Sequence, residues 1–294
     1  MGAVAAAGAG FVRVIGSEGA GNGQFQFPFG GVAFDGEGNL VVCDSFNHRI
    51  QVFRYSDGTH LRSIGSRGAG NGQFDHPWSV AFDGAGHIIV SEHGGCRVQV
   101  LRYSDGAHVR TIGSKGSGTR QLSGAKGIAV DGEGNVAVFD SDNARVQVFR
   151  LSDGAHIRTI GSRGSGNGPF ASGQGGVAFD SEGNLVVADC SNHRVQVLRY
   201  SDGAHVRTIG SREAGAGQFQ HPTGIAFDAA GHIVVLAHHR VHVLRYCDGA
   251  HVRTIGSFGP GNGRFNGPCG GIAIDSDGRI VVADSGNHRV QVLE

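Results

Sequence analysis

Short apolar runs alternate with polar turns along the whole chain, and the pattern repeats after about 48 residues. In the first copy the runs are VAFD, LVVCD, RIQVFR and LRSIGS, and the turns between them are rich in Gly, Asn, Asp and Ser. Runs of this length with many Val, Ile and Phe residues are typical of β-strands. No segment carries apolar residues at positions i, i+3 and i+4 over the length of a helix. The chain is therefore expected to be all-β, with four strands in each copy.

Six copies of this unit account for nearly the whole sequence. The first strand of each copy ends at an Asp, namely at Asp35, Asp83, Asp131, Asp180, Asp228 and Asp275. A period in the forties is typical of solenoids and propellers, and four short strands per copy predict an antiparallel blade. We therefore predict a single domain over residues 11–294, a six-bladed β-propeller. Its blades are expected at about 28–66, 77–114, 125–162, 174–211, 222–257, and 268–294 together with 11–17, after a flexible leader at 1–10.

The two ends of the chain predict how the ring closes. The last copy stops at Glu294, after its third strand, and lacks the fourth strand of the other copies. The missing strand is found at the other end, where residues 11–17 match the fourth-strand sequence of residues 61–66. Pairing the N-terminal strand with the C-terminal blade would remove two exposed sheet edges. We therefore expect residues 11–17 to complete the last blade.

The turn between the second and third strands carries a recognisable motif. It reads Asp44-Ser-Phe-Asn-His-Arg-Ile50 in the first copy, and residues 189–195 and 284–290 are close variants. With the preceding Phe-x-x-Pro and Gly-Val-Ala-x-Asp elements, these segments resemble the NHL repeat family over nearly all of the chain after residue 10. The resemblance implies a six-bladed propeller. Family members include propellers that bind RNA, propellers that bind proteins in ubiquitin-ligase or scaffold assemblies, bacterial sensor domains, and a related lyase that acts on peptide C-termini.

The order of strands assigns the connections to two faces. The loops between blades share one face with the Asn-His-Arg turns, and these loops carry Lys and Arg. The other face carries the Ser-Asp-Gly turns and is rich in Asp and Glu. The resemblance implies partner binding on the first face, and Trp78 is expected there beside the channel mouth. The expected binding-face residues are Arg67, Trp78, Lys115, Arg120, Lys126, Arg163, Arg212 and Arg264.

An acidic residue recurs five positions before an Arg in five copies. A ring of carboxylates near the axis could hold a hard cation, but a repeated charge-assisted hydrogen bond within the turn explains the pattern better. The expected structural pairs are Asp44 with Arg49, Glu92 with Arg97, Asp140 with Arg145, Asp189 with Arg194, and Asp284 with Arg289. In contrast, one Phe per loop, replaced by Leu122 in the third copy, is expected to wedge between neighbouring blades.

The fifth copy departs from the repeat and gathers histidines. It lacks the acidic residue, is two residues shorter, and contains His238, His239 and His242. Zinc accepts imidazole ligands, but the spacing matches no standard zinc site, so we expect neither a metal nor any other cofactor. No catalytic constellation is evident either, because the innermost strands repeat nearly the same residues and contain no His or Tyr.

Composition narrows the remaining alternatives. The formal net charge is zero, so no bulk basic field favours nucleic acid. Five cysteines without CxxC spacing are interpreted as reduced thiols, and no signal peptide or membrane segment is recognised. We expect a cytoplasmic monomer, not an enzyme, that binds a protein or peptide partner on the basic face as a scaffold or interaction module. Single-stranded RNA on the same face is the alternative, and a propeller hydrolase or lyase with a channel-bound metal is the third.

Overall fold

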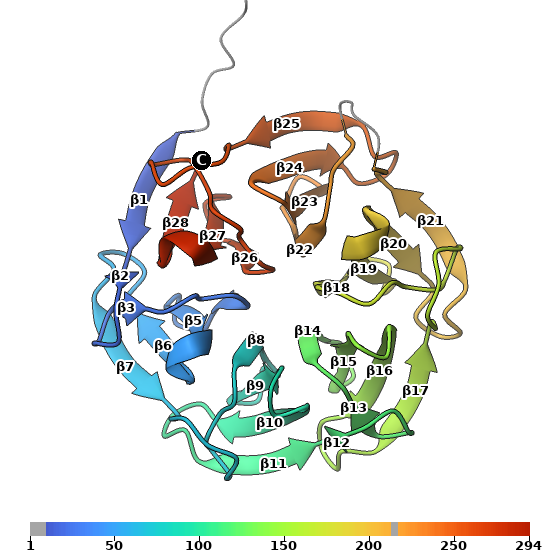
Figure 1. Cartoon of the computed structure of the whole chain (residues 1–294), viewed down its shortest axis with the longest axis horizontal. Coiled ribbons are helices and arrows are strands. Elements are labelled where there is room, and N and C mark those ends of the chain that lie inside the picture. The colour runs from blue at the N-terminus through green and yellow to red at the C-terminus, as the bar shows by residue number, and fades with distance from the viewer. Residues whose placement is uncertain (1–9, 213–216) are drawn as a thin grey trace, which may run out of the picture.

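Six four-stranded antiparallel sheets surround a central axis in the computed structural model (Figure 1). The structure describes residues 10–212 and 217–294, so nearly all of the expected leader at 1–10 lies outside the described residues. In Figure 1 each blade runs from an inner strand near the axis to an outer strand at the rim. The predicted all-β propeller is therefore confirmed.

The strands follow the chain from blade to blade. Blade 1 contains β4 (Val32–Phe34), β5 (Leu40–Asp44), β6 (Arg49–Phe53) and β7 (His60–Ile64); blade 2 contains β8 (Pro77–Phe82), β9 (His87–Glu92), β10 (Arg97–Arg102) and β11 (His108–Ile112); blade 3 contains β14 (Ala125–Val130), β15 (Asn135–Asp140), β16 (Arg145–Arg150) and β17 (His156–Ile160). Blade 4 contains β18 (Val177–Phe179), β19 (Leu185–Asp189), β20 (Arg194–Leu198) and β21 (His205–Ile209); blade 5 contains β22 (Pro222–Phe227), β23 (His232–Ala237), β24 (Arg240–Arg245) and β25 (His251–Ile255); blade 6 contains β26 (Ile272–Ile274), β27 (Ile280–Asp284), β28 (Arg289–Leu293) and β1 (Phe11–Ile15).

The loops between strands and between blades contain short strands and 3-10 turns. Two pairs of two-residue strands run parallel in the loops between blades: β2 (Ser17–Glu18) with β3 (Gln24–Phe25), and β12 (Ser114–Lys115) with β13 (Gln121–Leu122). Three turns between second and third strands form single 3-10 turns: η1 (Ser45–Asn47), η2 (Cys190–Asn192) and η3 (Ser285–Asn287). Among the described residues, no helix reaches the length and apolarity that crossing a lipid bilayer requires.

The N-terminal strand closes the ring, as predicted. Strand β1 pairs antiparallel with β28, with Val14 opposite Gln291 and Ile15 opposite Val290. Figure 1 shows the blue β1 at the rim beside the red β28. Both ends of the chain therefore contribute to one sheet, and neither sheet edge is left open at the junction.

The hydrophobic core lies between neighbouring blades. One cluster joins Ile15 and Val281 of blade 6 to Phe25, Val32 and Phe53 around blade 1. Burying each such side chain contributes about 2 kcal/mol. The wedge residues expected from the sequence are 0–3% exposed, and they are Phe25, Phe74, Leu122, Phe170, Phe219 and Phe265. They fix the spacing of the blades and therefore the width of the axial channel.

The glycine of the Ile-Gly-Ser element makes room for this wedge. Gly161 has a φ of +76°, and a Cβ at that position would lie 2.3 Å from Cε2 of Phe170. Any other residue at this position would be strained, because its backbone is left-handed, and its Cβ would clash with a buried ring. The recurrence of this glycine therefore follows from the packing between blades.

Candidate functional site

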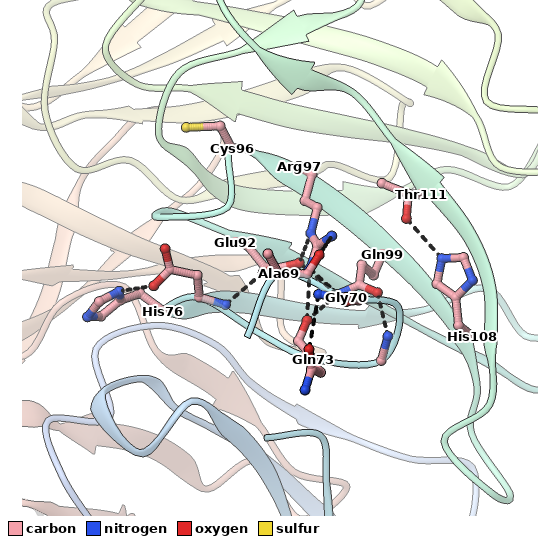
Figure 2. Close-up of polar contacts among 12 residues, drawn as sticks. Ala69, Gly70, Gln73, His76, Glu92, Cys96, Arg97, Gln99, His108 and Thr111 are labelled. Atoms are coloured by element: carbon pink, nitrogen blue, oxygen red, sulfur yellow. Dashed lines mark hydrogen bonds and ion pairs between the residues drawn. The ribbon is translucent and has the colours of Figure 1, made fainter. Parts of the chain in front are cut away.

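A buried carboxylate ties the Asn-His-Arg turn of a blade to the loop that precedes the blade. In blade 2, Glu92 accepts hydrogen bonds from Arg97 Nε at 2.6 Å, from Gln99 Nε2 at 2.8 Å and from the backbone N–H of Asp75 at 2.8 Å. Figure 2 shows Arg97 reaching from this carboxylate to the loop, where its guanidinium donates to the carbonyl oxygens of Ala69, Gly70 and Gln73. The charge pair therefore holds a turn and a loop together.

The same contact recurs in four other blades. The Arg Nε lies 2.8–2.9 Å from the carboxylate in the pairs Asp44–Arg49, Asp140–Arg145, Asp189–Arg194 and Asp284–Arg289. All five carboxylates are fully buried. Each accepts several hydrogen bonds from its own blade and loop, so these residues are structural contacts and leave no free carboxylate ring for a cation.

Blade 5 lacks this carboxylate. Ala237 stands in its place, and His242 replaces the usual Gln with its Nδ1 3.3 Å from Thr254 Oγ1. Burial lowers the pKa of His242 to about 4, so the imidazole is neutral at pH 7. His238 is exposed, while His239 accepts a hydrogen bond from the backbone N–H of Gly267 at 3.1 Å. The rings of His238 and His239 contact each other, with centroids 4.1 Å apart, whereas His242 forms its own contact with Thr254.

One group of three residues in the described part of the chain comes close enough to share an ion, and it lies elsewhere: His48, Asp75 and His76. The Nδ1 atoms of both histidines already have partners. His48 Nδ1 accepts from the backbone N–H of His76 at 3.2 Å, and His76 Nδ1 lies 2.8 Å from Asp75 Oδ1. These contacts join blade 1 to the loop before blade 2.

Histidines make this contact between blades at four of the six junctions. The Nδ1 atom accepts from the backbone N–H of the loop before the next blade in the pairs His288 with Phe27, His48 with His76, His193 with His221, and His239 with Gly267. The corresponding positions in blades 2 and 3 hold Cys96 and Ala144, which also have left-handed backbone conformations. Blade 3 therefore lacks the histidine contact on both of its sides.

The expected basic residues separate into two groups. Arg67, Lys115, Arg120, Arg163, Arg212 and Arg264 are exposed on the face that carries the loops between blades, which we call the loop face. Within residues 10–212 and 217–294 none of these six forms an ion pair. Trp78 and Lys126 lie instead at the mouth of the axial channel, where they are only 9% and 8% exposed. The sequence therefore placed Trp78 near the mouth but overestimated its exposure, and it gave Lys126 only as one of the basic residues of the loop face.

The opposite face is less acidic than its sequence suggests. The Asp of each Ser-Asp-Gly turn lies 2.5–3.0 Å from an Arg three residues earlier, in the pairs Arg54–Asp57, Arg102–Asp105, Arg150–Asp153, Arg199–Asp202 and Arg245–Asp248. Each pair is about half exposed, so solvent screening keeps its contribution to stability small. The pairing neutralises much of the charge contrast that the sequence predicted between the faces.

Four aromatic side chains meet at the channel mouth on the loop face, and we call them the aromatic cluster: Phe27, Phe29, Phe46 and Trp78. The ring of Phe29 stacks on Trp78 with centroids 5.7 Å apart and lies 5.6 Å from Phe27. Phe46 lies 5.3 Å from both phenylalanines. Phe46 is 42% exposed, and Phe27 and Phe29 are partly exposed.

Sequence reasoning missed Phe27 and Phe46. Phe46 replaces small residues such as Ser191 and Gly286 in the corresponding turns, and this replacement was the available signal. Phe27 also has an uncommon left-handed conformation, with a φ of +44°. His76 and His221, at the equivalent positions before β8 and β22, share this conformation, so it belongs to the repeated loop.

Lys126 lies against this cluster from blade 3. Its Nζ is 5.0 Å from the centre of the Trp78 ring, which is within the range of a cation–π contact. His93 packs against the same indole, with centroids 5.6 Å apart. Burial and the charge of Lys126 lower the pKa of His93, so a neutral imidazole is favoured beside the ammonium.

The cavity below the mouth is lined, among the described residues, by no acid–base group. A cavity of about 90 Å³ is lined by the innermost strands, chiefly by glycines such as Gly127 and Gly176 and by aliphatic residues such as Val80 and Ile225. None of its lining side chains titrates. Aromatic and titratable residues such as Trp78, His93 and Lys126 therefore lie at the mouth, above a cavity lined by glycines and aliphatic residues.

Comparison with known proteins identifies the repeat. The family model described as "NHL repeat" matches residues 30–53, 74–101, 122–149, 175–198 and 269–293. Blade 5, which lacks the buried carboxylate, is the one without a match. No curated protein sequence matches the chain.

Solved structures share the fold at low sequence identity. A protein of unknown function from Bacteroides thetaiotaomicron is 17% identical with a TM-score of 0.72, over 96% of this chain and 74% of that one. A gluconolactonase of Xanthomonas campestris is 17% identical with a TM-score of 0.67, over 92% and 88%. A chain of a nidogen/laminin complex is 17% identical with a TM-score of 0.61, over 82% and 79%. The five repeats and the closed ring together show that the chain belongs to the NHL-repeat family and is built as a six-bladed β-propeller.

Proposed function

We propose that this propeller is a non-catalytic interaction module that binds a protein or peptide partner on its loop face, centred on the aromatic cluster. The observation that carries this proposal is the contact among Phe27, Phe29, Phe46 and Trp78, from two neighbouring blades, at a partly exposed site. Aromatic residues are enriched in protein interfaces, and they often supply most of the binding energy.

Two further observations support binding without catalysis. The axial cavity carries no titratable side chain, and catalysis of hydrolysis or elimination depends on positioned acids and bases. The buried carboxylates and their partner arginines, such as Asp44 with Arg49 and Glu92 with Arg97, already form structural contacts. One structural neighbour is described in a nidogen/laminin complex, which is in keeping with a propeller that takes a protein partner.

The proposal is tested by selecting peptides from a random display library on the purified chain and measuring their affinity. Selected peptides should bind at least tenfold more weakly to Phe46→Ala, because truncation of a central aromatic anchor costs about 2 kcal/mol or more. Phe258→Ala is the matched control, since Phe258 is another exposed phenylalanine, at 65%, that contacts His239 instead of the cluster. Failure to select any peptide, or equal losses in both variants, would refute the proposal.

Single-stranded RNA is the second candidate, and one observation favours it. Exposed basic residues that form no ion pair in the described part of the chain, such as Arg67 and Arg120, lie on the same face as partly exposed aromatic rings, and RNA-binding surfaces combine these two features. Binding to a random RNA pool at two salt concentrations separates the candidates. RNA affinity that falls with salt and is lost in Arg67→Glu/Arg120→Glu would favour RNA over a peptide partner.

A further inference from the structure

The residues that enter the innermost strands at the loop face differ from blade to blade. The corresponding positions in the six copies hold Phe29, Trp78, Lys126, Gln174, Thr223 and Cys269. Trp78 crosses the mouth from blade 2, because a Cβ placed on Gly270 of blade 6 would lie 3.9 Å from its Nε1. Lys126 lies over the face of the same indole. The repeated architecture thus ends in a set of six unlike side chains.

Lys126 carries a buried positive charge without a direct counter-charge. Its ammonium donates one hydrogen bond, to the carbonyl oxygen of Gly173 at 3.1 Å. No carboxylate of the described residues lies within ion-pair distance, and the exposed Asp142 acts on Lys126 only through space. A buried ammonium is costly unless it is paired and fully hydrogen-bonded. Two of its three N–H donors therefore remain available for an anionic group.

We propose, on the basis of the function proposed above, that the channel mouth binds the side-chain carboxylate of an Asp or Glu in an extended peptide segment. Lys126 holds the carboxylate, and the exposed faces of Phe27 and Phe46 hold an apolar neighbour of that acidic residue. The charge of a carboxylate matches the site, because one negative charge balances the single positive charge of the Lys126 ammonium. A phosphate dianion would leave an excess negative charge in a mostly apolar, desolvated mouth.

The intrinsic fluorescence of the chain reports on this site directly, because Trp78 is its only tryptophan. The probes are acetylated and amidated pentapeptides with a central Glu flanked by Leu, Phe or Tyr, and a matched set with a central Gln. Their blocked ends leave one carboxylate per peptide. The Glu peptides should shift the Trp78 emission saturably and bind at least tenfold more tightly than the Gln peptides, since a charge-assisted hydrogen bond is lost in the latter.

Variants locate the effect at one side chain. Lys126→Met should remove the preference for Glu, whereas Arg253→Met, which removes an exposed positive charge from the outer strand β25, should leave it unchanged. If Lys126→Met fails to fold, the comparison of Glu and Gln peptides on the unaltered chain still tests the carboxylate site. No preference for Glu in any peptide of the panel would overturn the carboxylate site.

The outcomes distinguish this inference from the function on which it rests. Peptides that bind equally with Glu or Gln and lose affinity in Phe46→Ala would overturn the carboxylate site and leave the interaction module intact. A phosphoserine peptide that binds tenfold more tightly than its Glu counterpart would overturn the assignment in favour of phosphate. Failure of the display selection would refute the interaction module itself.

Discussion

Each buried carboxylate links a turn to the loop before its blade, because both of its oxygen atoms accept hydrogen bonds, as Asp189 illustrates. Asp189 accepts from Arg194 Nε at 2.9 Å, Asn192 Nδ2 at 2.8 Å, Gln196 Nε2 at 3.1 Å and the backbone N–H of Ala171 at 3.0 Å. Removing one partner of such a buried pair leaves an uncompensated charge and several unpaired donors. The position should therefore tolerate little change.

We expect Asp189→Asn to lower the free energy of unfolding by about 3–5 kcal/mol, because it leaves the Arg194 guanidinium buried and unpaired. Asp202→Asn is the matched control on the opposite face. Its pair with Arg199 is half exposed, so the loss should stay below about 1 kcal/mol. Urea unfolding of both variants measures the difference. Similar small losses in the two would contradict the structural importance of the buried pair.

The sequence reveals such pairs only in part. The five-residue spacing of Asp189 and Arg194 predicts their contact, because both lie in one turn. The hydrogen bond that the backbone N–H of Ala171 donates to Asp189 depends on a loop that precedes the blade and folds back onto it. The aromatic cluster was out of reach for a similar reason. Phe27 and Phe46 belong to different connections, and only the folded ring brings them together with Phe29, which contacts Trp78 of the next blade.

At the scale of elements, the sequence pattern predicted the four-stranded blades and the closing strand. The exact strand lengths and the short loop strands depend on tertiary packing, and the sequence did not predict them. The first strand has three residues in blade 1 (Val32–Phe34) but six in blade 2 (Pro77–Phe82). The loop sequences also gave no sign of the two-residue parallel strands β2 and β3. Such pairings are too short to leave a period in the sequence, because strand patterns need at least four residues.

The histidine contacts between elements should make stability depend on pH. Burial, followed by the nearby His221 and Arg212, lowers the pKa of His193 from its ordinary value of 6.5. The folded state thus binds the proton less tightly than the unfolded state. Stability from this contact is fully present above about pH 6.5 and is lost as the pH falls through the lowered pKa. Protonation also removes the acceptor that binds the His221 N–H.

Substituting His193 isolates this contribution. We expect His193→Asn to cost about 1 kcal/mol at pH 7.5, the value of one hydrogen bond, and close to nothing at pH 5. Urea unfolding at the two pH values measures both costs. Ala144→Asn is the control, because Ala144 has the same left-handed conformation without an imidazole, so any cost should be independent of pH. A cost for His193→Asn that is equal at both pH values would contradict the titration of this contact.

At the scale of the whole molecule, the ring depends on a non-covalent junction. Blade 6 combines β1 with three strands from the other end of the chain, whereas the other blades are continuous in sequence. Ile15 of β1 is 2% exposed and packs in the cluster between blades 6 and 1. Ile209 has the same place in the continuous blade 4 and is 4% exposed. These two residues therefore allow the junction to be compared with an ordinary blade.

If the ring unfolds as one cooperative unit, Ile15→Ala and Ile209→Ala should destabilise it equally, by about 2–5 kcal/mol each, because each leaves a similar cavity between blades. A separately detaching N-terminal strand would behave differently. Ile15→Ala would then add an early transition in urea and accelerate amide hydrogen exchange in β1 and β28, while Ile209→Ala would keep a single transition. Equal losses with single transitions would show that β1 supports the ring as strongly as a covalently continuous strand. This strength matters for the proposed site, because the channel mouth joins Trp78 of blade 2 to Gly270 of blade 6 across that junction.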